Sequence, residues 1–439
     1  MGPPVARNEV TADQAADLMG VRLQTIYAYV SRGLLRRRYR SNAAGHRVSV
    51  LALDEVLRLA GERTRVRTGS LEVLVETDVT LLDPKGALSF RGHDAVALAS
   101  GPFEEAAALV WGRPSVGEWA VAPSDAAEVR AAAAALGPGA TGTDRVRAAV
   151  LALATTDLDR AELKADHVVA VGRRAVAAGL VALGAGGPGS VAERLWGAVG
   201  ERPPTDDGVA ALNAALVLLM DHELAASTMA ARIAAGTGAD PWLVLLTGLA
   251  ALGGPRHGRS SVLAEDLLNA VRREGLGCLD RYATELGEVA LPGFGHKVYV
   301  DADPRAEVLL DHVARLDPAG WPAVESLLLA VSGRFGLSPN VDLGLAALVH
   351  AGGLRPGSGE TIFALSRMVG WLAHAMEEYP QGLRFRPRAV YTGDPAHDGG
   401  EDGPEPRPSS PPPDGGVSGG RAAAPAGAAA DPHTAHWDG

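Results

Sequence analysis

The sequence predicts a mainly α-helical protein. Two segments, 144–154 and 165–183, place apolar residues three and four positions apart, the spacing of an amphipathic helix. Glycine and proline residues fall between such segments, where turns between helices are expected. Aromatic and β-branched residues seldom alternate with polar ones, and 71–83 is the one clear strand candidate. A mainly helical body, preceded by a small basic module, is the expected architecture.

The distribution of charge separates a basic module from an acidic body. The chain has 439 residues, of which 47% are hydrophobic, and this is enough for more than one compact unit. Its net charge is −11. Residues 1–67 carry 12 Arg and no Lys against 6 Asp and Glu, a charge of +6, which leaves −17 for the remainder. Such asymmetry is typical of a basic module fused to an acidic body.

The cysteine content favours a reducing compartment, and the short apolar runs favour a soluble protein. Cys278 is the single cysteine, so an intramolecular disulfide is excluded. Residues 1–10 contain no apolar run of the kind found in signal peptides. The longest apolar stretches, such as 211–220, end well before the roughly 20 residues that a membrane span needs. We expect a soluble cytoplasmic protein.

The basic module has the pattern of two short helices, a hairpin and a third helix. Thr11 is placed to cap the first helix, and Gly20 to close it. Gly33 ends the second helix. Residues 36–50 supply a basic hairpin, and 53–62 read as the third helix.

This pattern, over residues 1–66, resembles the winged helix-turn-helix modules of the MerR and excisionase type. In such modules the second helix enters the major groove of DNA and the wing lies on phosphates. The alternative is a three-helix appendage whose arginines form a solvated face. The resemblance implies base contacts from Gln24, Thr25 and Tyr27, and backbone contacts from Arg36, Arg37, Arg38, Arg40 and Arg47.

The body, residues 67–393, contains polar residues at turns that are candidates for chemistry. His222, His257 and His296 precede or interrupt turns rich in glycine and proline, and Asp342 opens an apolar helix. Taken singly, each has an ordinary interpretation: a hydrogen-bonded core histidine, a loop histidine, or a helix N-cap in the case of Asp342. Arginines follow in the stretches "DPR", "ALSR" and "RFRPR".

Taken together, these residues indicate proton transfer on a substrate with several carboxylates. The sequence has no His-Glu-x-x-His motif, and one cysteine cannot build a zinc site alone, so we expect no metal. A phosphate loop and a dinucleotide fingerprint are also missing from the sequence. Guanidinium groups bind carboxylates in a bidentate manner, while imidazoles and a carboxylate can move protons.

The order and spacing of short motifs in the body resemble those of a known protein family. Six ordered stretches are similar to the signature series of citrate synthases, and 81–112 is similar to the amino-terminal region of that family. The match covers nearly all of 70–393. It implies a large domain of residues 67–258 and 352–393 and a small domain of residues 259–351. The six stretches are 221–228, 253–258, 292–306, 340–342, 362–378 and 386–393.

The resemblance implies that acetyl-CoA condenses with oxaloacetate to give citrate and CoA. Asp342 would remove a proton from the acetyl methyl group, and His257 would donate a hydrogen bond to the thioester oxygen. His296 would polarise the ketone of oxaloacetate and protonate the new alkoxide. The CoA thioester is a substrate, and no cofactor is expected.

The resemblance also implies the residues that bind the second substrate. His222 would hydrogen-bond oxaloacetate, and Arg305, Arg367 and Arg386 would clamp its carboxylates. In this family the residue matching Arg386 reaches the site from the partner subunit, so a homodimer is expected.

Three departures from the family pattern leave the acyl donor open. Val300 stands where many relatives carry a cation toward the CoA phosphates, and Lys297 can substitute for it. Leu343 begins a stretch that is aromatic in many relatives, and Glu360 is expected near the substrate arginines. A 2-methylcitrate synthase or a citryl-CoA lyase on the same scaffold is therefore an alternative. A DNA-binding regulator with a metabolite-sensing body is an alternative from another class.

Residues 394–439 are dense in Pro, Gly, Ala and Asp. Such a composition cannot bury enough apolar surface to offset the entropy lost on ordering. We expect a disordered tail without catalytic residues.

Overall fold

The computed structural model describes residues 9–12, 15–16, 23–31, 33–41, 47–52, 55–56, 75–114, 117–285, 291–300 and 302–385. Arg386 and the expected tail, 394–439, lie outside these residues. The side chains of Arg40 and Arg47 also lie outside the described part, although their backbones are in strands.

The amino-terminal module contains a three-stranded sheet and a described helix. Strand β3 (Arg47–Ala52) lies between β1 (Glu9–Thr11) and β2 (Arg37–Ser41), and both pairings are antiparallel. The predicted basic hairpin is therefore present as β2 and β3. Helix α2 (Leu23–Ser31) is the expected second helix, and Gly33 follows it with a φ of +71°, a conformation that glycine adopts without strain.

A small core holds this module together. Ile26 of α2 and Leu51 of β3 are almost fully buried in it, with Leu35 and Val56. Thr11 ends β1 and directly precedes the helical residue 12. Of the third helix expected at 53–62, only residues 55–56 are described, and they are helical.

The body begins with a second small antiparallel sheet, whose strand order is β4-β5-β6. The strands are β4 (Thr80–Asp83), β5 (Ala87–Phe90) and β6 (His93–Asp94). The strand prediction for 71–83 was wrong in its extent, because residues 75–79 are not in a strand. The N–H of Asp78 donates to the carboxylate of Glu377 at 3.0 Å, so it makes no ladder bond.

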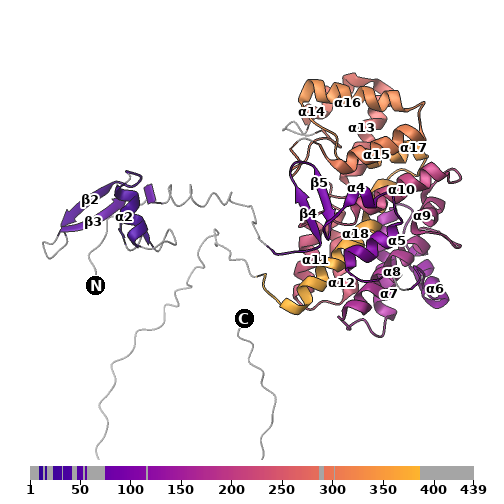
Figure 1. The fold of residues 1–439 in the computed structure, drawn as a ribbon, viewed down its shortest axis with the longest axis horizontal. Helices are drawn as coiled ribbons and strands as arrows, with labels where there is room; N and C mark the ends of the chain where they lie inside the picture. The colour runs from indigo at the N-terminus through magenta and orange to yellow at the C-terminus, as the bar shows by residue number, and fades with distance from the viewer. Residues whose placement is uncertain are drawn as a thin grey trace, which may run out of the picture. The chain divides into compact units, whose positions relative to one another are not determined.

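The rest of the body, as far as it is described, is mainly helical, which confirms the predicted mainly α-helical class (Figure 1). The predicted segments 144–154 and 165–183 correspond to α7 and α8. The first group of helices is α4 (Ala95–Leu98), α5 (Phe103–Trp111), α6 (Pro123–Ala134), α7 (Gly142–Thr156), α8 (Ala165–Ala182), α9 (Val191–Val199), α10 (Asp206–Leu219), α11 (Ala226–Gly236) and α12 (Pro241–Leu252). The second group is α13 (Ser260–Glu274), the 3₁₀ turn η1 (Leu276–Cys278), α14 (Leu279–Glu285), α15 (Pro304–Leu316), α16 (Trp321–Phe335) and α17 (Val341–Gly352). Helix α18 (Ser358–Glu378) and the 3₁₀ turn η2 (Tyr379–Gln381) follow.

Helix α18 is the central helix of the body. Its residues from Ser358 to Ala375 are all buried, and it packs against α5, α7, α8, α10, α11 and α12. A helix that is buried on every side requires close approach of its neighbours. At Gly248 of α12, a Cβ atom would lie 2.5 Å from the ring of Trp371, so only glycine allows this contact.

Helices α13 to α17 lie together at one end of the body in Figure 1. Within this group α15 packs on α17, and α13 packs on α17. The chain enters the group through residues 253–259 and returns to α18 through residues 353–357. In the described part of the chain, no helix has the length and apolarity needed to span a bilayer.

Candidate active site

One cavity of about 340 Å³ brings together the candidate residues of the body that the structure describes. They come from loops and helix ends far apart in the sequence, and Arg386 is the one candidate of the body outside the described residues. The candidates that line the cavity are His222, His257, His296, Lys297, Arg305, Asp342 and Arg367.

His222 follows the apolar helix α10 and lies at the edge of the cavity. Its Nε2 atom is 3.2 Å from the hydroxyl of Tyr299, and its side chain is buried. Burial, and then the positive charge of Arg305, lower the pKa of His222 well below its usual value. The imidazole is therefore neutral near pH 7.

A hydrogen-bonded pair of side chains orients His257. Its Nε2 atom lies 2.7 Å from Oγ of Ser227, and the indole N–H of Trp371 donates to the same Oγ at 3.2 Å. Because an indole can only donate, the arrangement that satisfies all three groups has the Ser227 hydroxyl donating to Nε2. The proton of the neutral ring is then on Nδ1.

The charge state of His257 agrees with this assignment. Burial, followed by the nearby Arg367, lowers the pKa of His257 to about 4. The ring is neutral at physiological pH. Its Nδ1–H group can donate a hydrogen bond to an oxygen while the ring stays uncharged.

His296 lies on the expected loop, held by main-chain geometry. Gly293 and Gly295 have φ values of +82° and +76°, and a Cβ at Gly293 would meet Cβ of Leu343 at 2.9 Å. The N–H groups of Val298 and Tyr299 both donate to Nδ1 of His296, at 3.0 and 3.2 Å. Nη2 of Arg305 lies 3.4 Å from Nε2, a longer contact than the two at Nδ1, so the two shorter bonds favour the neutral tautomer with its proton on Nε2.

Asp342 lies in the first turn of α17. The N-cap of this helix is Asn340, whose side chain accepts from the N–H of Asp342 at 3.0 Å, so the N-cap interpretation of Asp342 was wrong. Its Oδ1 atom is shielded from solvent without a hydrogen-bond partner in the described residues. Burial is the largest effect on the carboxyl, and it raises the pKa of Asp342 to about 7.

Asp303 connects the His296 loop to the start of α17. Its Oδ2 atom accepts from Nη2 of Arg305 at 2.8 Å and from the N–H of Val341 at 3.0 Å. Asn340 adds a second connection, because its amide donates to the carbonyl of Gly295 at 2.8 Å. Asp303 and Asn340 were not among the predicted site residues, although both stand beside named residues in "DPR" and "NVD".

Arg367 brings a buried guanidinium into the cavity, and the negative charge of Asp221 acts on it. Its Nε donates to the carbonyl of Leu219 at 2.7 Å, while Nη1 and Nη2 have no partner among the described residues. The side chain is fully buried, and burial lowers the pKa of Arg367 to about 10. A buried guanidinium whose terminal nitrogens have no hydrogen-bond partner favours the binding of an anionic ligand.

The position of Glu360 and the presence of a metal site are the two remaining questions about the cavity. Glu360 does not line it and lies 3.9 Å from Arg147, so the placement of Glu360 near the substrate arginines was wrong. Seven residues make almost two turns of α18, so Glu360 and Arg367 lie on nearly the same face but about 10 Å apart along the helix axis. Across the described ranges, His, Cys, Asp and Glu side chains nowhere gather in threes that could hold a metal ion.

The comparisons with known proteins agree with this geometry. The family described as "Citrate synthase, C-terminal domain" matches residues 71–388. The chain belongs to the citrate synthase family. Citrate synthase 2 of Bacillus subtilis (strain 168) is 35% identical over 209 residues, which cover 46% of this chain and 56% of that relative. The chain is thus matched over little more than half the length of this relative.

Solved citrate synthases share the fold. A ternary complex of carboxymethyl coenzyme A and oxaloacetate with the citrate synthase of Thermoplasma acidophilum has a TM-score of 0.61 and 26% identity. It covers 74% of this chain and 94% of that one. The citrate synthase of Pyrobaculum aerophilum has a TM-score of 0.60 and 26% identity, with 74% and 91% coverage. The family resemblance of the body is therefore confirmed.

Proposed function

We propose that this protein condenses acetyl-CoA with oxaloacetate and water to give citrate and CoA. The observation that carries the proposal is the cavity that His257, His296 and Asp342 share in a chain of the citrate synthase family. The guanidiniums of Arg305 and Arg367 line the same cavity. The solved relative from Thermoplasma acidophilum, bound to a CoA derivative and oxaloacetate, supports these substrates.

In the first step, the carboxylate of Asp342 takes a proton from the methyl group of acetyl-CoA. An α-proton of a thioester is far too weakly acidic for a carboxylate in water. Nδ1 of His257 donates a hydrogen bond to the thioester oxygen, so the negative charge on the enolate oxygen is stabilised as it forms. A pKa of about 7 makes Asp342 a stronger base than an exposed carboxylate.

In the second step, the enol carbon attacks the ketone of oxaloacetate and forms the new carbon–carbon bond. Nε2 of His296 donates its proton to the oxygen that was the ketone, which becomes the hydroxyl of citryl-CoA. Water then cleaves the thioester and releases CoA as the thiol. His222, Arg305 and Arg367 hold the carboxylates of oxaloacetate in position.

We also propose that helices α13 to α17 close over the rest of the body when substrate binds. The small domain of residues 259–351 and the large domain of residues 67–258 and 352–393 would then be the moving parts. Closure would exclude water from the cavity, and Lys297, exposed at its rim, would meet the CoA phosphates.

The proposed oligomer is a homodimer in which Arg386 of the partner subunit completes the site. Exposed apolar side chains on three helices of the body support such an interface, namely Leu151 of α7, Ile233 of α11 and Leu243 of α12.

The buried free thiol of Cys278 fits a cytoplasmic protein.

The test is a steady-state assay of thiol release with oxaloacetate and either acetyl-CoA or propionyl-CoA. The proposal predicts release with acetyl-CoA and higher kcat/KM for it than for propionyl-CoA. Higher kcat/KM for propionyl-CoA would establish the 2-methylcitrate alternative. Cleavage of citryl-CoA to acetyl-CoA without net condensation would establish the lyase. A folded protein that releases no thiol with either donor would overturn the enzymatic proposal.

A second proposed function is DNA binding by residues 1–66, in the manner of a winged helix-turn-helix. The guanidinium of Arg37 lies 5.6 Å from the ring of Tyr27 and donates to the hydroxyl of Tyr39 at 3.1 Å. This contact links the predicted base-reading helix to the predicted wing. Arg36 and Arg38 are exposed beside it, as is Gln24, whereas Thr25 is partly buried.

DNA binding would depend steeply on salt. We expect the affinity of the full chain for duplex DNA to fall about tenfold or more between 50 and 200 mM salt, since each neutralised phosphate releases counterions. Replacing Arg36, Arg37 and Arg38 by Gln should flatten this dependence, whereas Arg130→Gln, on the exposed face of α6, should leave it unchanged. Without binding at 50 mM salt, the module would be a structural appendage.

A further inference from the structure

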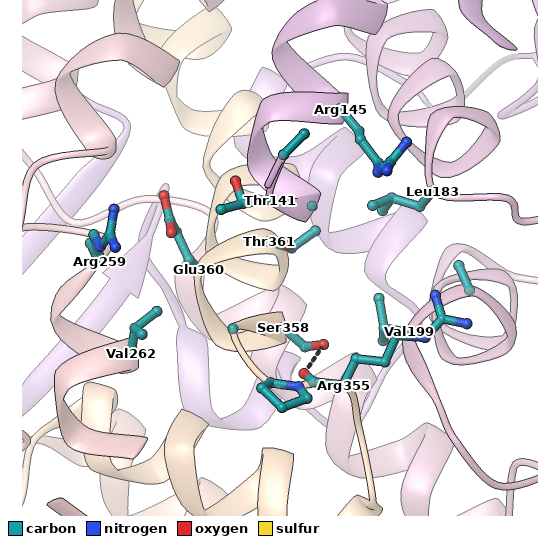
Figure 2. Close-up of a pocket in the computed structure, with 15 residues that line it drawn as sticks. Thr141, Arg145, Leu183, Val199, Arg259, Val262, Arg355, Ser358, Glu360 and Thr361 are labelled. Atoms are coloured by element: carbon teal, nitrogen blue, oxygen red, sulfur yellow. Dashed lines mark hydrogen bonds between the residues drawn. The ribbon is translucent and has the colours of Figure 1, made fainter. Parts of the chain in front are cut away.

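A second cavity, of about 310 Å³, lies where the chain passes between the two groups of helices (Figure 2). Arg259 and Val262, at the start of α13, line it from one side. Arg355, Pro356 and Gly357, on the connection from α17 to α18, form another part of its wall. The ends of α7, α8, α9 and α18 complete it. We call this cavity the hinge pocket.

The hinge pocket is rich in positive charge. Arg145, Arg259 and Arg355 line it against a single carboxylate, that of Glu360. Figure 2 shows Arg145 and Arg355 on one side of the pocket, and Arg259 beside Glu360 on the other. Within the described ranges, none of the three arginines forms an ion pair with an acidic side chain at 4.0 Å or less.

Two helix N-termini also border the pocket. Thr141 and Gly142 begin α7, and Gly357 and Ser358 begin α18, and all four residues line the pocket. The N-terminal end of a helix carries partial positive charge and favours anions. Asp144 caps the start of α7 and Glu265 accepts the N–H of Gly357, so the excess positive charge comes from the three guanidiniums, and it favours an anionic occupant over a cationic one.

The other residues that line the hinge pocket limit which ligands can bind there. Leu183, Val199 and Val262 present apolar surface, and the buried carboxyl of Glu360 can accept a hydrogen bond from a hydroxyl group. The separation of the cations to opposite sides suits a molecule with two anionic groups, whereas a single small anion could meet only one side.

The hinge pocket shares its walls with the candidate active site. Arg259 lines the hinge pocket, while His257 and Ser260, on either side of it in the chain, line the active-site cavity. Helix α18 also contributes to both cavities: Thr361 lines the hinge pocket and Phe363 lines the active-site cavity. The N–H of Gly357 donates to Glu265 of α13 at 3.1 Å, so the connection before α18 is also joined to the second group of helices.

We propose that the hinge pocket binds a small organic polyanion, with at least two carboxylate or phosphate groups, and that its occupant regulates closure over the active site. An occupant bridging Arg145 of α7 and Arg259 of α13 holds the two groups of helices in the arrangement described here. It binds this arrangement more tightly than a closed one, so it opposes closure and by linkage lowers both kcat and the affinity for oxaloacetate without occupying the oxaloacetate site. The effect on kcat rests on the proposed function, whereas binding itself does not.

Calorimetric titration of the full chain with pyrophosphate and with tricarballylate tests the binding. We expect at least one probe to bind, with affinity at least about tenfold weaker in the double variant Arg145→Gln/Arg355→Gln. Arg130→Gln removes the same charge outside the pocket and should bind as the wild type does. Arg305→Gln removes an arginine of the active site and should also retain binding. The probe that binds more tightly distinguishes a phosphate from a polycarboxylate ligand.

A gain-of-affinity variant keeps the test decisive if the double variant does not fold. Glu360→Gln removes the one carboxylate from the pocket wall with little change of shape, so binding of the same probe should tighten about threefold or more. Failure of both probes to bind at millimolar concentration would overturn the proposal. So would binding that Arg305→Gln abolishes, or that the pocket variants leave unchanged.

The regulatory part has a readout that does not depend on turnover. Amide hydrogen exchange of residues 253–262 should slow when the probe binds, and this slowing should be lost in the double variant. Unchanged exchange with a bound probe would overturn the coupling. If the chain released no thiol at all, the proposed function would fail, while calorimetry and exchange would still decide the site.

Discussion

Oγ of Ser227 lies 2.7 Å from Nε2 of His257 and also accepts the indole N–H of Trp371. The three groups come from α11, the loop before α13, and α18. Their hydrogen bonds determine which ring nitrogen of His257 carries the proton, and hence which one faces the cavity as a donor.

Removing the Ser227 hydroxyl should therefore impair turnover without weakening substrate binding. In Ser227→Ala, Nε2 of His257 loses its donor, and the ring can adopt the tautomer that has no proton on Nδ1. We expect kcat to fall about 10-fold to 100-fold, with KM for oxaloacetate within about twofold of the wild-type value. Trp371→Phe should give a smaller loss, because it keeps the hydroxyl. Thiol-release kinetics of both variants measure the effect, and a kcat unchanged in Ser227→Ala would refute the role of this hydrogen bond.

Asp342→Asn should lower kcat at least about 100-fold, the typical worth of a positioned proton-transfer group. The amide fills the same space but cannot take the methyl proton of acetyl-CoA. Asp311→Asn is the matched control, since Asp311 is exposed on α15. Thiol release under saturating substrates is the measurement. Near-normal turnover would remove Asp342 from its proposed role.

The pH dependence of turnover should follow the same carboxyl. Burial raises the pKa of Asp342 to about 7, and only its ionised form can act as the base. We expect kcat/KM to rise with pH through this value and to level off above it. His257, with a pKa of about 4, does not titrate in this range. A profile that is flat between pH 5.5 and 8.5 would contradict the assignment.

Stability should respond to pH in the opposite direction. In the unfolded chain the Asp342 carboxyl titrates near 3.8, and in the folded protein near 7. Its contribution favours folding below the unfolded value and is lost as the pH rises to the folded value. Above pH 7 the wild type therefore bears a cost of up to about 4 kcal/mol that the neutral amide avoids.

Denaturant unfolding of the wild type and Asp342→Asn at pH 5 and pH 8 measures this cost. The variant should gain stability relative to the wild type by a few kcal/mol at pH 8, and by clearly less at pH 5. An equal difference at both pH values would show that the carboxyl keeps an ordinary pKa.

Replacing Arg367 should mainly affect the binding of oxaloacetate. Its two terminal nitrogens are buried without partners in the described residues, so a carboxylate of the substrate is the natural acceptor. We expect Arg367→Met to raise KM for oxaloacetate at least about 10-fold. Arg367→Lys keeps a charge but loses the bidentate geometry, so it should restore only part of the affinity. A KM unchanged in Arg367→Met would show that this guanidinium does not touch the substrate.

Helices were easier to predict than strands, for a local reason. The spacing of apolar residues within α7 and α8 is a property of each segment alone, and it predicted both helices closely. The strand expected at 71–83 was too long, because the carboxylate of Glu377, 299 residues away, takes the N–H of Asp78. Strands β5 and β6 are short, and they gave no alternating pattern to detect.

The sequence by itself determined the helical class of the body, its family and most of the side chains that line the active-site cavity, because motifs and local periodicity survive in the order of residues. It misplaced Glu360 and gave no sign that Ser227, Trp371 and Asp303 support the site. Ser227 and Trp371 are 144 positions apart, and the packing of α11 against α18 brings them within hydrogen-bond distance. Asp303 reaches the N–H of Val341, 38 positions away, in the packing of α15 against α17. The tertiary structure alone also raises the pKa of Asp342, since removal of water by neighbouring helices is what makes its charge costly.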